Sequence, residues 1–251
     1  MNTFITFNLN SWVPVAKNMS YKEKISKFAS FVRRKYGSPS VIAIQEVITG
    51  GGRYLDEIYN AFEGDYHVIV PPTFDYRLHA KSLVTVTLLK KSDVDQFEVK
   101  HLGKCLPNRI SYVTAWIDGK PWSILNVYAV QISYFAGRTE EYIAVRKELH
   151  EKLWEELLTE AKNQSKERVV ILGDLQESSE GSHVKDLISM GYRELILGCP
   201  TVRNEIFAEK SIDHILFSEK AWADFNPAGF AMDGDLVNEI SDHCLLAVMS
   251  A

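Results

Sequence analysis

The sequence predicts an α/β (α+β) fold in which two packed β-sheets, mixed but mostly antiparallel, form a four-layer sandwich flanked by helices. Three observations favour this fold: helical stretches alternate with buried strands, several strands follow one another in hairpin runs, and no linker, repeat or low-complexity tract interrupts the chain. A purely parallel, doubly wound sheet would not contain such hairpin runs. We therefore expect a single domain over residues 1–251, with a division near residue 130 and one sheet from each half.

The first half of the chain alternates strands with helices and then continues as a run of strands. Residues 21–36 place their apolar side chains on one helical stripe, and Gly37 and Pro39 are typical helix-ending residues. The pair Asp118-Gly119 between two apolar runs is a strong hairpin signal. We expect strands at 4–9, 41–44, 66–70, 83–89, 97–99, 111–117 and 122–127, and helices at 21–36 and 55–62.

The second half begins with a long helix near Glu140. Thr139 is a suitable N-cap, two glutamates lie in the first turn, and leucines recur every four residues from Leu149 to Leu157. After this helix we expect strands at 169–172, 212–217 and 244–249 and a short helix at 184–190.

Composition and charge limit the possible classes of protein. With 251 residues, of which 46% are hydrophobic and 24% charged, the chain can bury a core without disulfides. Cys105, Cys199 and Cys244 are widely spaced, which favours free thiols. The net charge of −5 gives no global basic field, although a local groove could still bind nucleic acid. No stretch resembles a signal peptide or a bilayer span, so we expect a cytoplasmic protein.

Several of the expected strands end in residue types that bind metal ions or phosphate. Asn8 and Asn10 follow the first strand on the same side of the backbone, although asparagine also favours simple turns. Glu46 comes almost directly after the buried run 41–44, where an unpaired carboxylate would be costly. Either a bound cation or an arginine partner would satisfy Glu46.

Two further strands end in the same way. Gly173 permits a tight bend after the run 169–172, and Asp174 then lies where α/β proteins often carry catalytic groups. Tyr128 follows the run 122–127, where an ordinary aromatic packed at a sheet edge is the simpler interpretation.

The last two polar positions are expected to meet. Asp213 lies inside an apolar strand and needs a partner there. His243, in the tripeptide Ser241-Asp242-His243, is a natural partner. Taken alone, Ser-Asp-His could simply cap the strand that follows it.

In their order and spacing these motifs resemble those of the endonuclease/exonuclease/phosphatase superfamily, which has the DNase I-like fold. The resemblance covers the chain from Phe4 to Val248. It implies a catalytic domain that hydrolyses a phosphoester with Mg²⁺, or sometimes Mn²⁺, held by oxygen ligands. The matching motifs are Phe-Asn-Leu-Asn (7–10), Ile-Gln-Glu (44–46), Asn-Val-Tyr (126–128), Gly-Asp-Leu-Gln (173–176), Ile-Asp-His-Ile-Leu (212–216) and Ser-Asp-His (241–243).

The resemblance implies a metal-binding role for three residues. Glu46 matches the family's main metal ligand. Asn10 stands where a further Asp or Asn assists the metal, and Asp242 matches a more variable acidic position near it.

The resemblance also implies catalytic roles for four residues. Asn8 matches the asparagine that supports the phosphate, and Asp174 the residue that positions or deprotonates the attacking water. His243 matches the histidine that contacts the scissile phosphate, and Asp213 the carboxylate that orients it. Phosphoryl transfer depends mainly on positioning and on neutralisation of negative charge, which such a set supplies.

Two positions refine this resemblance. Gln176 stands where the family usually has asparagine, and its longer side chain can keep the hydrogen bond with altered geometry. Tyr128, with Gln131 three residues later, resembles the exonuclease III, abasic-site endonuclease and retrotransposon-endonuclease branches, whereas other branches have histidine at this position. A tyrosine hydroxyl can donate to a phosphate oxygen without adding charge.

We therefore predict a divalent-metal-dependent phosphodiester hydrolase, with a nuclease acting on DNA as the leading hypothesis. Gln131, Tyr134 and Arg138 lie in a segment that mixes aromatic and basic residues, which could contact phosphates and stack on bases. An ordinary loop with solvated charges would have the same composition. Family behaviour implies a monomer, and the sequence indicates no membrane and no protein partner.

Two alternatives stay open at this point. A phosphatase or phosphodiesterase acting on a small-molecule or lipid phosphoester fits the net negative charge and the lack of a rich Lys/Arg cluster. A catalytically weak binding or scaffold homologue is the other, and its melting temperature would not respond to magnesium or manganese.

Overall fold

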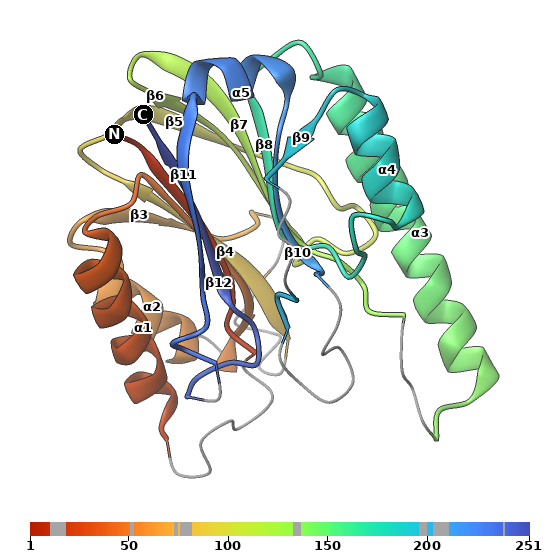
Figure 1. The fold of residues 1–251 in the computed structure, drawn as a ribbon. Coiled ribbons are helices and arrows are strands. Elements are labelled where there is room, and N and C mark those ends of the chain that lie inside the picture. Colours follow the sequence, from red (N-terminus) through yellow and green to blue (C-terminus); the bar gives the residue numbers. More distant parts are fainter. Residues whose placement is uncertain are drawn as a thin grey trace.

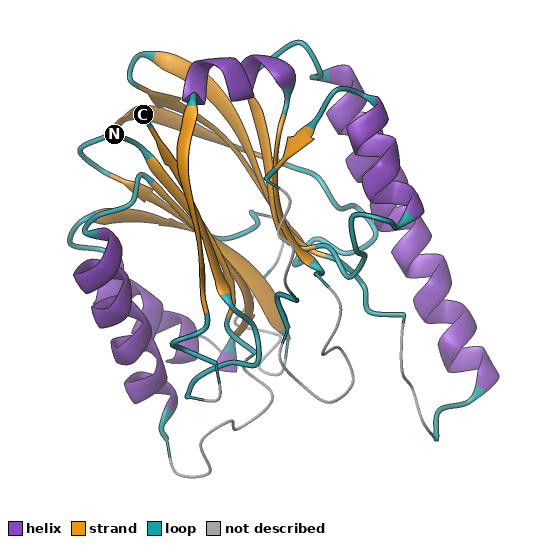
Figure 2. Ribbon diagram, in the orientation of Figure 1, coloured by secondary structure: helices purple, strands orange, loops and turns teal. Residues whose placement is uncertain are grey.

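Two six-stranded β-sheets pack face to face, and helices cover their outer faces (Figures 1 and 2). The computed structural model describes residues 1–10, 19–50, 53–72, 75, 82–132, 137–195, 200–202, 211–237 and 239–251. The four layers confirm the predicted sandwich of two mixed, mostly antiparallel sheets flanked by helices. Within the described residues, no helix is long and apolar enough to cross a membrane.

Sheet one contains strands from both ends of the chain. Its one parallel pair is β1 with β2, and the other neighbours run antiparallel. The strand order is β11 (Pro227–Asp233), β12 (Leu245–Ser250), β1 (Thr3–Asn8), β2 (Val41–Ile48), β4 (Leu83–Lys90) and β3 (Tyr66–Ile69).

Sheet two contains the middle strands of the chain. Its parallel pair is β7 with β8, and the other neighbours are antiparallel. The strand order is β5 (Val94–Lys100), β6 (Ile110–Ile117), β7 (Lys120–Tyr128), β8 (Val169–Asp174), β10 (Asp213–Phe217) and β9 (Arg193–Glu194).

The two sheets do not divide the chain near residue 130. β5, β6 and β7 precede that residue but belong to sheet two, and β11 and β12 follow it but belong to sheet one. The expectation of one sheet from each half is therefore wrong. β1 and β12 show the same apolar patterns as strands that pair with sequence neighbours, so their long-range pairing leaves no local signal.

Alternating side chains of the central strands fill separate cores. In β1, Ile5 and Phe7 pack with residues of the helices on the outer face, whereas Phe4 points into the core between the sheets. In β12, Leu245 faces the helices and Leu246 faces sheet two. Strands buried on both faces must be apolar throughout, so the polar residues at their ends stand out.

The helices form the two outer layers. α1 (Tyr21–Tyr36) and α2 (Arg53–Phe62) cover sheet one, and α3 (Glu140–Asn163) and α4 (Ser182–Ser189) cover sheet two (Figure 1). The Thr139 side chain accepts a hydrogen bond from the backbone N–H of Tyr142 at 3.2 Å, which confirms it as the N-cap of α3. Asp118 and Gly119 both have positive φ in the turn between β6 and β7, as the hairpin signal predicts.

Two parts of the fold were not predicted: the two-residue strand β9 and the segment 219–233. Residues 219–233 form the short helix α5 (Glu219–Phe225) and the edge strand β11. α5 has only seven residues, and β11 is mostly half-buried, so neither has a strong apolar period. Cys105 and Cys244 form no disulfide within the described part of the chain, and Cys199 lies outside it.

Candidate active site

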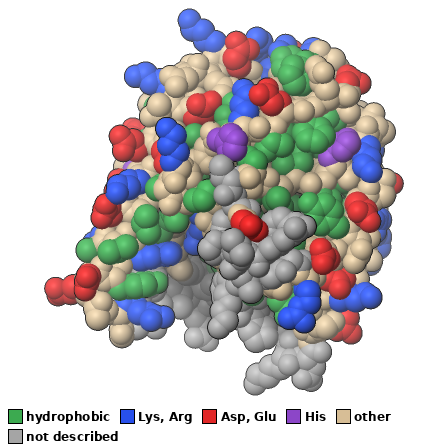
Figure 3. Space-filling view, turned by 180° about the vertical axis from the view of Figure 1, so that it is seen from behind, with side chains coloured by type: hydrophobic (Ala, Val, Ile, Leu, Met, Phe, Trp, Pro, Cys, Tyr) green, Lys and Arg blue, Asp and Glu red, His purple; other side chains and the backbone are tan. Residues whose placement is uncertain are grey.

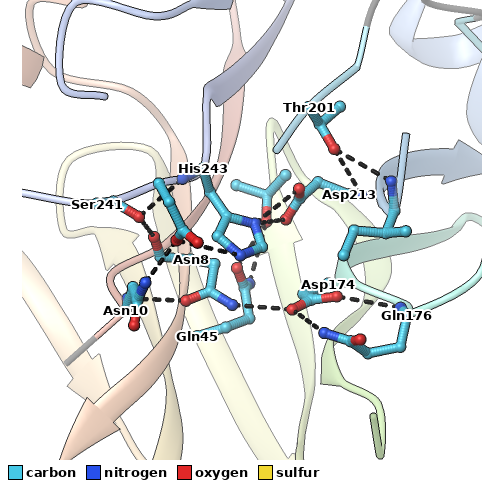
Figure 4. Close-up of polar contacts among 12 residues, drawn as sticks. Asn8, Asn10, Gln45, Asp174, Gln176, Thr201, Asp213, Ser241 and His243 are labelled. Atoms are coloured by element: carbon cyan, nitrogen blue, oxygen red, sulfur yellow. Dashed lines mark hydrogen bonds and ion pairs between the residues drawn. The ribbon is translucent and has the colours of Figure 1, made fainter. Parts of the chain in front are cut away.

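The polar residues that end the strands meet at one end of the sandwich, between the two sheets. β1 and β2 are parallel neighbours in sheet one, and β7 and β8 are parallel neighbours in sheet two, so each pair ends at a common edge. β12 and β10 run antiparallel to them and begin at that edge. Figure 4 shows the side chains that converge there.

His243 is held by Asp213, and both side chains are buried. Nδ1 of His243 lies 2.9 and 3.1 Å from the two carboxylate oxygens of Asp213 (Figure 4). Burial lowers the pKa of His243, but the charge and hydrogen bond of Asp213, together with the charges of Asp174 and Asp242, outweigh burial and the pKa rises to about 10. The ring is therefore an imidazolium near neutral pH. Its Nδ1–H donates to Asp213, and Nε2 lies 3.7 Å from a carboxylate oxygen of Asp242.

Asp174 is completely buried and accepts three hydrogen bonds. Nδ2 of Asn8 and Nε2 of Gln176 each lie 2.8 Å from its Oδ2, and the backbone N–H of Gln176 donates to Oδ1 at 3.0 Å. Burial, assisted by the charge of Asp213, raises the pKa of Asp174 to about 7, although His243 lowers it. A carboxylate with this pKa can accept a proton from water near neutral pH. Gln176 thus keeps its contact with Asp174 despite its longer side chain.

Asn8 connects Asp174 in sheet two with an oxygen-rich cluster in sheet one. Its Nδ2 also lies 3.2 Å from Oε1 of Glu46, and its Oδ1 accepts a hydrogen bond from the backbone N–H of Asn10 at 2.8 Å. Nδ2 of Asn10 in turn donates to Asp242. Glu46, Asn10 and Asp242 are therefore linked through one continuous set of contacts.

Three site residues have left-handed backbone conformations. The φ angles are 43° at Asn10, 53° at Glu46 and 55° at Gln176. Each such conformation in a residue with a side chain costs on the order of 1–3 kcal/mol, and such strain is concentrated at functional sites. At Glu46 it coincides with a bulge in β2, which redirects the side chain out of the strand's alternating pattern.

Two hydroxyl groups fix the loops that carry the histidine and its partner. Oγ of Ser241 donates to the backbone oxygen of Asn8 at 2.7 Å and accepts from the backbone N–H of His243 at 3.0 Å. Oγ1 of Thr201 accepts from the backbone N–H of Asp213 at 3.2 Å (Figure 4). The serine of Ser-Asp-His therefore ties the tripeptide to the end of β1.

A buried polar pair joins the two sheets near the site. Gln45 and Asn126 have no exposed surface, and Nε2 of Gln45 donates to Oδ1 of Asn126 at 2.8 Å. Nδ2 of Asn126 donates to the backbone oxygen of Val86 at 2.9 Å. Both residues lie within the sequence motifs, but the sequence predicts no role for them. A buried amide pair is recognisable only when the positions of both strands are known.

Tyr128 ends β7 and lies against a cation. The guanidinium of Arg109 is 3.9 Å from the centre of its ring, and the tyrosine is 7% exposed. Burial raises the pKa of Tyr128 well above its usual value, and the nearby carboxylate of Glu46 raises it further. The hydroxyl therefore keeps its proton and can act as a neutral donor.

Lys24 on α1 is a site residue that sequence reasoning missed. Its ammonium group is buried and donates to the backbone oxygen of Asn10 at 2.8 Å. Burial lowers the pKa of Lys24 to about 8, although the carboxylates of Glu46 and Asp242 oppose this shift. One sequence signal points to Lys24: it lies one turn before Phe28 on the apolar stripe of the helix. A lysine at such a buried position is rare unless it has a polar or charged partner.

No family model and no curated protein matches the sequence, but solved structures match the fold over almost the whole chain. An AP endonuclease from Archaeoglobus fulgidus has a TM-score of 0.71 at 14% identity, covering 100% of this chain and 99% of that one. The 3′ phosphatase NExo from Neisseria, bound to a product DNA hairpin, has a TM-score of 0.69 at 14% identity, with 100% of both chains covered. TDP2 from D. rerio, complexed with a single strand DNA product, has a TM-score of 0.66 at 16% identity, covering 98% of this chain and 97% of that one. The chain therefore has the DNase I-like fold that the sequence resemblance implies.

The residues that resemble the superfamily's motifs are brought together by this fold. Gln131 and Arg138 take part in other contacts: the backbone oxygen of Gln131 accepts two hydrogen bonds from Arg146, and exposed Arg138 lies over the ring of Tyr142. Tyr134 lies outside the described residues. The residues that meet at the site are Asn8, Asn10, Glu46, Tyr128, Asp174, Gln176, Asp213, Asp242 and His243.

The donor atoms fit the hard divalent cation that the sequence resemblance implies. Glu46 and Asp242 supply carboxylate oxygens, and Asn10, whose Nδ2 donates to Asp242, also carries an amide oxygen. Mg²⁺ and Mn²⁺ prefer ligand sets of this kind. The positive charge of Lys24 faces the same two carboxylates, so it opposes the binding of a cation there.

We expect Lys24→Gln to lower the Mg²⁺ concentration required for half-maximal hydrolysis by about tenfold, because removing a charge a few ångströms away changes the binding free energy by roughly 1.4 kcal/mol. Glutamine still offers a donor to the backbone oxygen of Asn10. Titration of activity with Mg²⁺ measures the effect. Lys27→Gln, on the exposed side of the same helix, is the matched control. A higher Mg²⁺ requirement in Lys24→Gln would contradict the electrostatic explanation.

Proposed function

We propose that this protein is a divalent-metal-dependent phosphodiester hydrolase that acts on DNA. The proposal depends on one observation: an imidazolium, a buried carboxylate with a pKa near neutrality and an oxygen-rich cluster converge between the two sheets (Figure 4). The fold relatives support it, because their printed names are those of an AP endonuclease, a 3′ phosphatase and TDP2, two of them with DNA products.

Asp174 is the group that we assign to the attacking water. Its three hydrogen bonds hold the carboxylate in one orientation, and its raised pKa allows it to take a proton near neutral pH. General base catalysis is most effective when the base has a pKa near the working pH. Gln176 and Asn8 then act as positioning residues, because they touch Asp174 and fix its orientation.

His243 is the group that we assign to the phosphate. Asp213 holds Nδ1–H, so Nε2–H is the donor that remains for a non-bridging phosphate oxygen. A fixed cationic donor stabilises the negative charge of the transition state more than that of the ground state. The neutral hydroxyl of Tyr128 is a second candidate donor.

Glu46, Asn10 and Asp242 are the residues that would hold the cation. When bound, Mg²⁺ would neutralise charge on the phosphate oxygens. Asn8 contacts Glu46 as well as Asp174. This one amide therefore fixes the position of the cation site relative to the general base, Asp174.

Local rather than global charge supports a nucleic-acid substrate. On the face shown in Figure 3, basic and acidic side chains are interspersed, and the whole chain carries 28 Lys and Arg against 33 Asp and Glu. Next to Tyr128, however, the guanidinium of Arg109 lies near that of Arg146, and the pKa of Arg146 is lowered by burial and by Arg109. The buried Nε of Arg109 has no hydrogen-bond partner among the described residues. Two such arginines beside the site are suited to backbone phosphates.

The test compares four substrates under identical conditions. The protein is incubated with Mg²⁺ or Mn²⁺ and, separately, with plasmid DNA, an abasic-site duplex, single-stranded RNA and a chromogenic phosphodiester. We expect cleavage of DNA that a chelator abolishes and that Glu46→Gln strongly reduces. Glu98→Gln, an exposed glutamate on β5, is the matched control.

Other outcomes identify the alternatives. Cleavage of the chromogenic compound alone would favour a hydrolase of small or lipid phosphoesters. If no substrate is cleaved and neither Mg²⁺ nor Mn²⁺ changes the melting temperature, the protein is a binding or scaffold homologue.

A further inference from the structure

A second cluster of metal-ligand side chains lies under the loop that follows Asp174. It consists of His150 on α3, His183 on α4 and Glu177 in the loop between β8 and α4. Each residue offers a ligand atom, and these atoms lie within 4.8 Å of one another. His150 has no exposed surface, and the side chains of His183 and Glu177 are 15% and 13% exposed.

The hydrogen bonds of the two histidines indicate that each ring directs a nitrogen lone pair toward the same oxygen of Glu177. Nδ1 of His150 lies 2.7 Å from the backbone oxygen of Val130, and Nε2 of His183 lies 3.2 Å from a carboxylate oxygen of Glu151. Each of these nitrogens faces an acceptor and therefore carries the hydrogen. The other nitrogen of each ring faces the same atom, Oε1 of Glu177, at 3.3 Å from His150 and 2.6 Å from His183.

This arrangement requires positive charge at the centre. In the neutral rings, two nitrogen lone pairs would face a carboxylate oxygen, which is repulsive. A proton on one ring relieves only the contact between that ring and Glu177. To relieve both contacts, the fully buried His150 would have to be an imidazolium as well, which is costly. One divalent cation satisfies all three ligand atoms with both rings neutral.

We propose that His150, His183 and Glu177 bind a zinc ion that is separate from the oxygen-rich cluster at Glu46. Two imidazole nitrogens and one carboxylate are a common zinc ligand set, whereas Mg²⁺ prefers oxygen alone. Ligand atoms on a tetrahedral ion with bonds of about 2 Å lie about 3.3 Å apart, which is the separation between His150 and Glu177. The shorter contact of His183 would have to open by roughly 0.7 Å.

The surroundings have features that metal-binding histidines usually show. A ligating histidine normally donates its other N–H to a carbonyl or carboxylate, as His150 and His183 both do. The ring of His183 is also stacked on Trp154, with ring centres 4.9 Å apart and planes 8° from parallel, so its orientation is fixed. The ion would join α3, α4 and the loop that carries Gln176 and Glu177.

The test measures zinc binding by the whole chain after removal of metal with a chelator. Competition with a chromophoric chelator gives stoichiometry and affinity, and circular dichroism shows that each sample is folded. We expect one Zn²⁺ per chain and a higher melting temperature with zinc. His183→Gln and Glu177→Gln should each weaken binding at least about a hundredfold, beyond what loss of a mere supporting contact costs.

Three controls separate this site from other zinc ligands. His101→Gln, on the exposed surface, should bind zinc like the wild type. Glu46→Gln, which impairs the proposed hydrolysis, should also keep this zinc, so the two proposals can fail independently. The third is Co²⁺ substitution of the wild-type protein, whose visible absorption should show tetrahedral coordination. Folded wild-type protein that binds no zinc, or His183→Gln that binds it unchanged, would show an ion-pair cluster instead and overturn the proposal.

Discussion

Replacing His243 with glutamine is expected to lower the rate of metal-dependent hydrolysis at least about a hundredfold, which is the usual effect of removing one such group. Glutamine can still donate a hydrogen bond toward Asp213, but it carries no positive charge. The variant therefore removes charge from the phosphate position and leaves the buried carboxylate with a possible partner. Single-turnover rates at saturating Mg²⁺ measure the chemical step directly.

The control for this variant is His101→Gln, which removes an exposed histidine remote in sequence from the site motifs. Its rate should equal that of the wild type. If His243→Gln keeps more than about a tenth of the wild-type rate, which corresponds to less than 1.4 kcal/mol of transition-state stabilisation, the assigned role is wrong.

Gly173→Ala is expected to destabilise the protein by at least about 3 kcal/mol, because it combines backbone strain with a severe clash. Gly173 has a φ of +140°, and a β-carbon there would lie 2.0 Å from the backbone oxygen of Val127. That oxygen belongs to the neighbouring strand β7, so relief requires the two strands to separate. Asp174 is the next residue, and its displacement should also reduce hydrolysis.

Urea denaturation measures the change in the free energy of unfolding. Activity measured at low temperature, where more of the variant is folded, shows whether the displacement of Asp174 also lowers the rate. Gly64→Ala is the matched control, because a β-carbon at Gly64 meets nothing within 4 Å. We expect that control to change stability by less than about 0.5 kcal/mol. A Gly173→Ala variant as stable as Gly64→Ala would contradict the close contact between β7 and β8 at Gly173.

The sequence predicted the parts of the fold that have a local pattern. The helix at Tyr21–Tyr36 was predicted to the residue, and the hairpin at Asp118-Gly119 follows from turn chemistry alone. The meeting of Asp213 with His243 was also foreseeable, because a carboxylate inside an apolar strand needs a partner and few candidates exist.

The rest depends on contacts between distant segments. The division of strands between sheets could not be predicted, because β1 pairs with β12 from the other end of the chain. Lys24 becomes significant only when its helix is placed beside Asn10. The zinc-ligand cluster combines single residues of two helices and a loop, and none of the three stands out in its own segment.

The pairing of β1 with β12 also sets the order in which the protein matures. The backbone oxygen of Asn8 receives the hydroxyl of Ser241, which lies 233 residues later in the sequence. Until that segment has been synthesised, a nascent chain has β1 without one of its two neighbours and lacks His243 altogether. Domains generally fold as units once their strands are available, so we expect the site to form only after residues 241–250 have been synthesised.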